Sequence, residues 1–109
     1  MADLTARELI ENMPNSFRPE RAGRAKAVIQ FRLSGEGGGD WYVQIKDKTC
    51  TVTEGVTDGA DATLQMNASD YVALATGKLG GMKAFTSGRV KASGNLSLLM
   101  RMDSWFVRV

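Results

Sequence analysis

Few side chains of this 109-residue sequence belong to types that perform chemistry. It contains no histidine, which excludes Ser-His-Asp and Cys-His nucleophiles and histidine-bound metals. Its single cysteine, Cys50, can form neither an internal disulfide nor a thiolate zinc site. Asp61, Asp70 and Asp103 are too scattered to identify a catalytic carboxylate pair. We therefore predict no catalytic residue, no metal site and no cofactor.

Cys50 and a glycine-rich turn are the remaining candidates for chemistry. Cys50 occupies an inward position of a predicted strand with no basic residue beside it on that face. Because a reactive thiolate needs electropositive surroundings, a buried structural thiol is the favoured interpretation, and an enzyme that uses Cys50 is disfavoured. The turn 35–39 has four glycines but lacks the lysine and the following helix of a phosphate-binding loop.

Positive charge is concentrated in the stretch 15–26, which we expect to be irregular. Its basic residues are Arg18, Arg21, Arg24 and Lys26. They could bind the phosphates of a CoA head group, or steer the domain to an anionic membrane surface. Because Glu20 interrupts the group, a solvated loop is the favoured interpretation. The net charge of +2 is too small to indicate a nucleic-acid partner.

Length and composition indicate one globular domain over residues 1–109. Hydrophobic residues make up 43% of the chain and charged residues 24%, which argues against disorder. No apolar run approaches the roughly 20 residues of a membrane span. The first residues lack the basic flank and apolar stretch of a signal peptide, so we expect a cytoplasmic protein.

Hydrophobic periodicity predicts five strands and four helical segments. The strands are expected at 27–33, 41–46, 49–53, 62–67 and 89–92, each with one apolar and one polar face. The helices are expected at 3–13, at 70–76, around 82–85 and after Gly94-Asn95 as far as Phe106. Thr5 and Glu8 have capping-box spacing, Pro14 is expected to end the first helix, and Asn67 or Ser69 to cap the second.

These elements predict one α+β domain. The first three strands are joined by short turns, which favours an antiparallel meander. The polar face of each strand can meet water while the helices cover the apolar face. We therefore predict a five-stranded, mostly antiparallel sheet with helices on one face.

The order of the elements and several short strings resemble the sterol carrier protein type-2 domain, a small lipid-binding module. The strings are Val28-Ile29-Gln30-Phe31, Trp41-Tyr42-Val43, Ala60-Asp61-Ala62-Thr63-Leu64, Thr76-Gly77-Lys78, Ala84-Phe85-Thr86-Ser87-Gly88-Arg89-Val90-Lys91 and Gly94-Asn95-Leu96. The sequence differs at Asn95, where many relatives have an acidic residue. It ends at Arg108-Val109 without the peroxisomal tripeptide of some relatives, which weakens a peroxisomal placement.

The resemblance implies an apolar tunnel between sheet and helices. The tunnel would take a fatty acid, a fatty acyl-CoA or a sterol-like lipid, and the protein would bind this ligand without transforming it. The expected floor consists of Ile29, Phe31, Trp41, Val43, Leu64 and Met66. The expected walls and lid consist of Leu74, Met82, Phe85, Leu98, Leu99, Met102 and Trp105.

The pattern of apolar residues has a simpler explanation, because apolar stripes usually fill a solid core. Without the resemblance, that explanation would be favoured. Two functions therefore remain open: noncatalytic lipid binding or transfer, with transient membrane contact, and a module whose apolar helices pack against a partner chain or a second copy. Trp105 and Phe106 could touch a bilayer, gate the tunnel or pack on the sheet.

Overall fold

The computed structural model describes residues 5–106, apart from the side chain of Asp103. Leu4, expected on the first helix, and the final Arg108-Val109 lie outside the described residues. The strands are β1 (Ala27–Ser34), β2 (Gly39–Lys46), β3 (Thr49–Glu54), β4 (Ala62–Asn67) and β5 (Val90–Gly94). The helices are α1 (Ala6–Glu11), α2 (Met13–Ser16), α3 (Pro19–Ala22), α4 (Ala68–Ala75), α5 (Gly81–Thr86) and α6 (Leu96–Met102), followed by a 3₁₀ turn, η1 (Asp103–Trp105).

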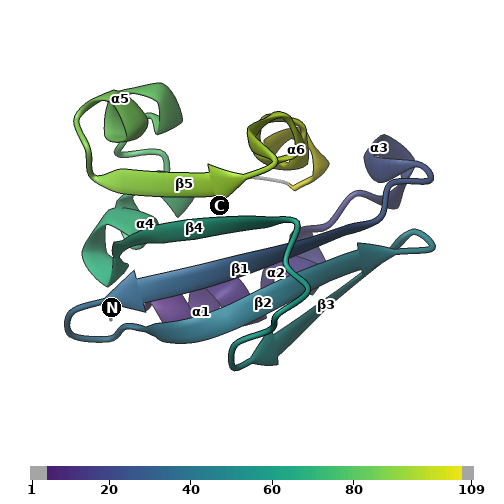
Figure 1. Ribbon diagram of the computed structural model, residues 1–109, viewed down its shortest axis with the longest axis horizontal. Coiled ribbons are helices and arrows are strands. Elements are labelled where there is room, and N and C mark those ends of the chain that lie inside the picture. The colour runs from purple at the N-terminus through teal and green to yellow at the C-terminus, as the bar shows by residue number, and fades with distance from the viewer. Residues whose placement is uncertain (1–4, 107–109) are drawn as a thin grey trace.

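The strands form one sheet in the order β3-β2-β1-β4-β5 (Figure 1). The predicted meander is confirmed, because β1 pairs with β2 and β2 with β3 in antiparallel fashion. β5 is antiparallel to β4, but β4 is parallel to β1. The predicted α+β class with a mostly antiparallel sheet is therefore confirmed, with one parallel pair at its centre.

The parallel pair requires the chain to cross the sheet between β3 and β4. The crossing segment passes over the polar face of β1, where Gln30 is buried beneath it. The Gln30 amide nitrogen donates to the carbonyl oxygens of Trp41 at 3.0 Å and Gly55 at 3.1 Å. Its amide oxygen accepts from the backbone nitrogen of Thr57 at 2.9 Å. One polar side chain thus ties the crossing segment to two strands.

The first helix has the predicted capping box, but α1 covers only Ala6–Glu11 of the predicted range 3–13, and the residues after it are more regular than predicted. The Thr5–Glu8 capping box is present in both directions. Pro14 does not simply end a helix, because it lies in the first turn of α2. Pro19 likewise lies in the first turn of α3, within the stretch expected to be irregular. Proline is well tolerated there, since first-turn amides have no partner within the helix.

The ends of the later helices follow local capping chemistry. The Asn67 side chain accepts from the Ser69 backbone nitrogen at 2.9 Å, which caps α4 as predicted. Gly77 follows that helix with a φ of 82°, a conformation suited to glycine. The last helix is shorter than predicted: α6 ends at Met102, and Phe106 instead forms a bridge with Phe17.

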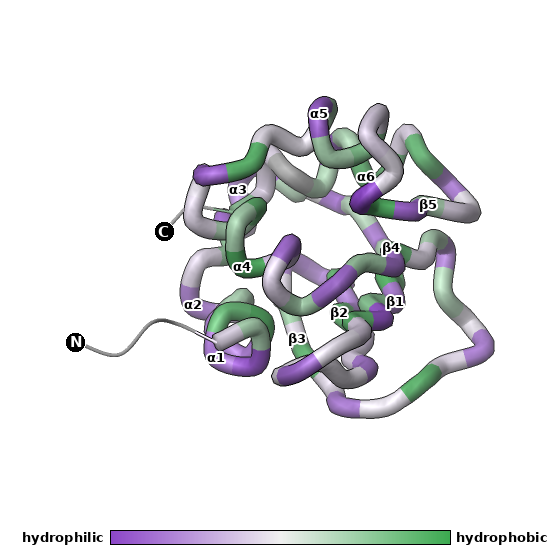
Figure 2. The backbone as a smooth tube through the Cα atoms, turned by 90° about the vertical axis from the view of Figure 1, so that its left-hand side faces the viewer, coloured by the Kyte–Doolittle hydropathy of each residue, from purple (hydrophilic) through white to green (hydrophobic). Residues whose placement is uncertain are grey.

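The helices that cover the sheet lie on one side of it. In the side view, α1, α2 and α4 lie on one side of the strands, whereas α5 and α6 lie near the β5 edge (Figure 2). The largest fully buried side chains are Trp41, Ile10, Ile29, Ile45 and Val43. The solid part of the core therefore lies between α1 and the β1–β2 pair. Within residues 5–106, every helix is too short or too polar to cross a membrane.

Candidate functional site

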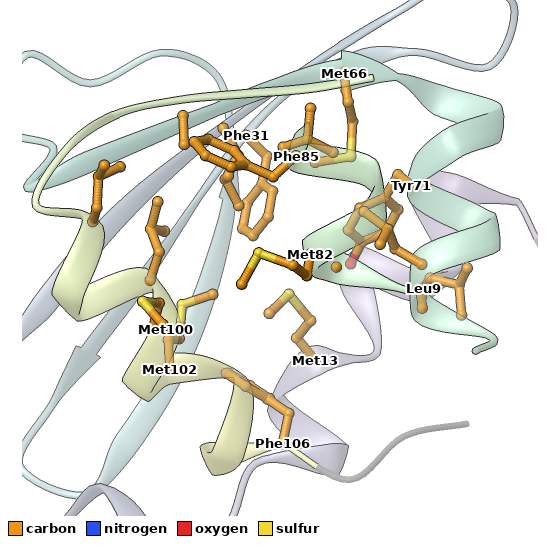
Figure 3. A pocket seen from close by; sticks show the side chains of 18 of the residues that line it. Leu9, Met13, Phe31, Met66, Tyr71, Met82, Phe85, Met100, Met102 and Phe106 are labelled. Atoms are coloured by element: carbon orange, nitrogen blue, oxygen red, sulfur yellow. The ribbon is translucent and has the colours of Figure 1, made fainter. Parts of the chain in front are cut away.

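A pocket of about 560 Å³ lies between the helices and the β1–β4–β5 part of the sheet. Figure 3 shows side chains from separate helices and strands pointing toward this common space. The lining residues are Leu9, Met13, Ser16, Phe31, Leu64, Met66, Tyr71, Leu74, Ala75, Gly81, Met82, Phe85, Val90, Ala92, Leu96, Leu99, Met100, Met102 and Phe106.

The floor of the pocket follows from strand register. Phe31 pairs with Leu64, and Leu64 pairs with Ala92, so one row of three residues runs across β1, β4 and β5. Met66 and Val90 form the next inward pair two residues further. Since side chains two residues apart share one face of a strand, both rows point toward the helices.

Helical periodicity supplies the walls. Tyr71, Leu74 and Ala75 share one face of α4, because residues three and four positions apart are neighbours on a helix. Leu96, Leu99 and Met100 repeat this spacing on α6. α5 contributes Gly81, Met82 and Phe85, while Leu9 and Met13 come from α1 and α2 and Phe106 from beyond the last helix.

Methionine is unusually frequent in the wall. All five methionines among the described residues line the pocket, namely Met13, Met66, Met82, Met100 and Met102. An unbranched, polarizable side chain can adopt several shapes at low cost, which suits a wall that must accommodate different apolar surfaces.

The described lining contains no charged side chain and only two hydroxyl groups. The Ser16 hydroxyl donates to the backbone oxygen of Asn12 at 3.3 Å. The Tyr71 hydroxyl makes no hydrogen bond within the described residues, and the Tyr71 ring packs edge-on against Phe31 at 5.8 Å. Burial raises the pKa of Tyr71, so its hydroxyl stays protonated at neutral pH. Tyr71 is therefore an uncharged donor available to a guest.

The pocket opens to solvent beside α5 and α6. Met82 is 69% exposed and Met100 is 73% exposed although both line the pocket. Phe85 and Leu96, also in the lining, are 48% and 45% exposed. We call these four residues the apolar rim. Only one other large hydrophobic residue of the part described, Val56, is comparably exposed.

The structure places the thirteen predicted site residues in two groups. Eight line the pocket: Phe31, Leu64, Met66, Leu74, Met82, Phe85, Leu99 and Met102. The other five lie in the core outside the lining: Ile29, Trp41, Val43, Leu98 and Trp105.

The second group lies where the layers already touch. Ile29 pairs with Val43 across β1 and β2, and both are completely buried. Trp41 is covered by α1, whose Arg7 guanidinium lies 5.4 Å from the centre of the indole ring. Inward direction alone does not separate pocket from core, because that depends on where each helix makes contact with the sheet.

Several lining residues were not among the predicted site residues, and some had a usable signal. Tyr71 lies three residues before Leu74, so helical spacing already links the two positions. Ala92 lies on the apolar face of a predicted strand, but its small side chain gave no reason to select it. Leu9 and Met13 come from the first helical segments, and no local signal links them to residues about 50 positions away along the chain.

The remaining candidates for chemistry lie outside the lining. Partial burial raises the pKa of the Cys50 thiol to about 11, which disfavours the reactive thiolate at neutral pH. The four basic residues of 15–26 lie on and around α3, where Arg18 is half-buried and the others are exposed. Among the side chains that the structure describes, no three of the metal-ligating types lie close enough together to hold a metal ion.

An apolar pocket between a five-stranded sheet and short helices, open at one edge, is the arrangement of a small α+β domain of the sterol carrier type. The chain belongs to the SCP-2 sterol transfer family, whose model matches residues 7–107. This confirms the family resemblance that the sequence shows. The structure contains a pocket, and a tunnel that runs through the domain stays a prediction.

The chain matches one part of much longer relatives. Bovine hydroxysteroid dehydrogenase-like protein 2 is 39% identical over 97 residues, which cover 88% of this chain and 23% of the relative. The mouse protein of the same name is 36% identical, and the match covers 20% of its length. The chain thus spans about a fifth of these relatives.

Solved structures show the same fold. A palmitated sterol carrier protein 2-like protein from Aedes aegypti aligns with a TM-score of 0.73 at 22% identity, covering 89% of this chain and 86% of the other. An inverting sec-alkylsulfatase from a Pseudomonas species aligns with a TM-score of 0.84 at 17% identity, covering 94% of this chain and 16% of the enzyme. This fold therefore occurs both in a chain of similar length and as a small part of a much longer one.

Proposed function

We propose that this domain binds a long apolar lipid in the pocket and transfers it, without transforming it. The observation that carries the proposal is an apolar pocket of about 560 Å³ whose described lining has no charged side chain. That volume falls within the roughly 300–1,000 Å³ of small-molecule sites. Membership of the SCP-2 sterol transfer family and the palmitated Aedes aegypti relative support the same function.

The lipid binds with its apolar part inside and any charged group at the mouth. An ionised carboxylate or phosphate is strongly disfavoured in an apolar site that offers no ionic partner. The Tyr71 hydroxyl can donate to a neutral polar atom inside the pocket. A fatty acid, a fatty acyl-CoA and a sterol-like lipid all satisfy this arrangement if the head group of the first two stays outside.

Burial of a single tail supplies enough free energy. At about 0.8 kcal/mol for each methylene, a C16 tail gains roughly 12 kcal/mol before ordering costs. A micromolar complex requires only about 8 kcal/mol. The difference leaves room for the cost of ordering the tail and the methionine side chains around it.

A pocket-filling substitution tests the proposal. Ala92 lies in the floor row on β5, so Ala92→Phe adds an aromatic ring inside the pocket. Titration of a fluorescent C16 fatty acid should show an affinity at least about tenfold lower for Ala92→Phe than for the unmodified protein.

Ser93→Phe is the matched control. Ser93 is exposed and adjoins Ala92 on β5, so this substitution places the same ring on the opposite face of the same strand. Its affinity should stay within about twofold of the unmodified protein. Equal affinity for all three folded proteins would contradict binding in this pocket.

The apolar rim also favours a second candidate, a module that packs against a partner chain or a second copy. Exposed contiguous apolar side chains often mark a protein interface. Sedimentation of the unmodified protein at low micromolar concentration tests self-association, which this candidate predicts and a lipid carrier does not require.

A further inference from the structure

We propose that the apolar rim, together with the basic residues beside it, is the surface by which this domain docks onto an anionic phospholipid bilayer. The inference rests on the proposed lipid-binding function and assigns a partner to the same pocket. It begins from exposure: Met82 and Met100, the most exposed members of the rim, also line the pocket. A lipid that enters or leaves the pocket beside them passes over an apolar surface.

Charge complementarity identifies the partner. Residues 71–102 contain five basic residues, Lys78, Lys83, Arg89, Lys91 and Arg101, and no acidic residue. The nearest acidic residues along the sequence are Asp70 and Asp103, and Asp70 pairs with Arg89 at 3.6 Å. The whole chain carries a net charge of only +2, yet in this stretch, which includes α5, β5 and α6, basic residues outnumber acidic ones, as they also do in 15–26.

Two of these cations belong to the two helices that carry the rim, and each is the chain neighbour of a rim residue. Lys83 directly follows Met82 on α5, and Arg101 directly follows Met100 on α6. Both are exposed, and neither forms a salt bridge within the described part of the chain. Methionine and phenylalanine can insert among acyl chains while lysine and arginine meet anionic head groups, which is the arrangement of interfacial membrane anchors.

This surface differs from the basic group around α3. Arg18, Arg21, Arg24 and Lys26 have no member in the pocket lining, whereas the rim belongs to it. Removal of charge from the two groups should therefore weaken vesicle binding to different extents. Removal beside α3 lowers only the overall charge, whereas removal at the rim also alters the docking site.

Vesicle binding by three proteins tests the proposal: the unmodified chain, the double variant Lys83→Gln with Arg101→Gln, and the matched double variant Arg21→Gln with Arg24→Gln. Each is sedimented with phosphatidylcholine vesicles that contain about one third phosphatidylserine, and with vesicles of phosphatidylcholine alone. The unmodified chain should prefer the anionic vesicles. The rim variant should lose about tenfold in partition to them, and the α3 variant less than about twofold.

Fatty-acid titration without vesicles separates this proposal from the proposed function. Neither pair of substituted residues lines the pocket, so all three proteins should bind the fluorescent C16 fatty acid alike. Fatty-acid binding without preference for anionic vesicles would overturn the docking surface and leave the lipid-binding function intact. Equal losses by both variants, or a dimer in sedimentation that buries the rim and is weakened by Met100→Gln, would also overturn it.

Discussion

At the scale of single residues, burial keeps the polar atoms of the interior uncharged. It raises the pKa of the Cys50 thiol and of the Tyr71 hydroxyl, because the apolar surroundings penalise their charged forms. Both groups therefore remain protonated at neutral pH. Neither has the properties of a nucleophile or base, and the Tyr71 hydroxyl remains a neutral donor in an otherwise apolar wall.

The Cys50 shift predicts slow and pH-dependent alkylation. With a pKa of about 11 rather than 9.0, the thiolate fraction at pH 8 falls about 100-fold. Iodoacetamide labelling followed by intact mass should be at least that much slower for the folded protein than for the urea-unfolded chain. The folded rate should rise about tenfold for each pH unit from 8 to 10, whereas the unfolded rate levels off above its own pKa. Equal rates in both states would contradict the burial of this thiol.

At the scale of elements, local rules predict more than long-range ones. Strand alternation and a helix cap at Asn67 or Ser69 are predicted from neighbouring residues, and the structure has the cap at Asn67. The second and third short helices escape prediction because Pro14 and Pro19 can either end a helix or occupy its first turn. The parallel pairing of β4 with β1 escapes it too, since strand periodicity has no information about direction.

Gln30 shows the same limit in a single side chain. Its position on the polar face of β1 predicts contact with water, yet the segment that crosses from β3 to β4 buries it. The same limit applies to predicting which inward residues line the pocket. Phe31 and Ile29 share one strand face, but only Phe31 reaches a region where the helices leave space. Inward direction is local information, and the position of a gap between layers is not.

The Gln30 contacts predict a measurable loss of stability on substitution. Gln30→Met retains much of the side-chain volume but leaves the partners of the amide without it, and should lower the free energy of unfolding by about 2 kcal/mol. Gln44→Met is the control, because Gln44 is exposed on the neighbouring strand, and its effect should stay within about 0.5 kcal/mol. Urea unfolding at constant slope measures both. Coincident transitions for the two variants would show that Gln30 does not fasten the crossing segment.

At the scale of the whole molecule, the space between the sheet and the helices is filled at one end and forms the pocket at the other. α1 packs on the β1–β2 pair and fills the space there, while α4, α5 and α6 surround the pocket over β1, β4 and β5 (Figure 3). The closed part holds the largest fully buried side chains of the core, and the open part is lined by the methionines. A tightly packed part thus adjoins a part whose methionine side chains can adjust to a ligand.

This division predicts strong stabilisation by ligand. A fatty acid present at about 100 times its Kd should stabilise the folded state by about 2.7 kcal/mol. For a domain of this size that corresponds to a rise in Tm of about 10 °C. Differential scanning fluorimetry should show the rise for the unmodified protein and for Ser93→Phe, and a clearly smaller rise for Ala92→Phe. A Tm that no lipid changes would contradict a ligand-binding pocket.

Native mass spectrometry of the purified protein under gentle conditions tests the central claim most directly. A lipid-binding pocket predicts a mass above that of the bare chain by the mass of one lipid, and loss of this difference after extraction with organic solvent. The extracted molecule identifies the class of ligand. A bare-chain mass that persists after incubation with palmitic acid and with cholesterol would contradict the lipid-binding account and favour the partner-binding module.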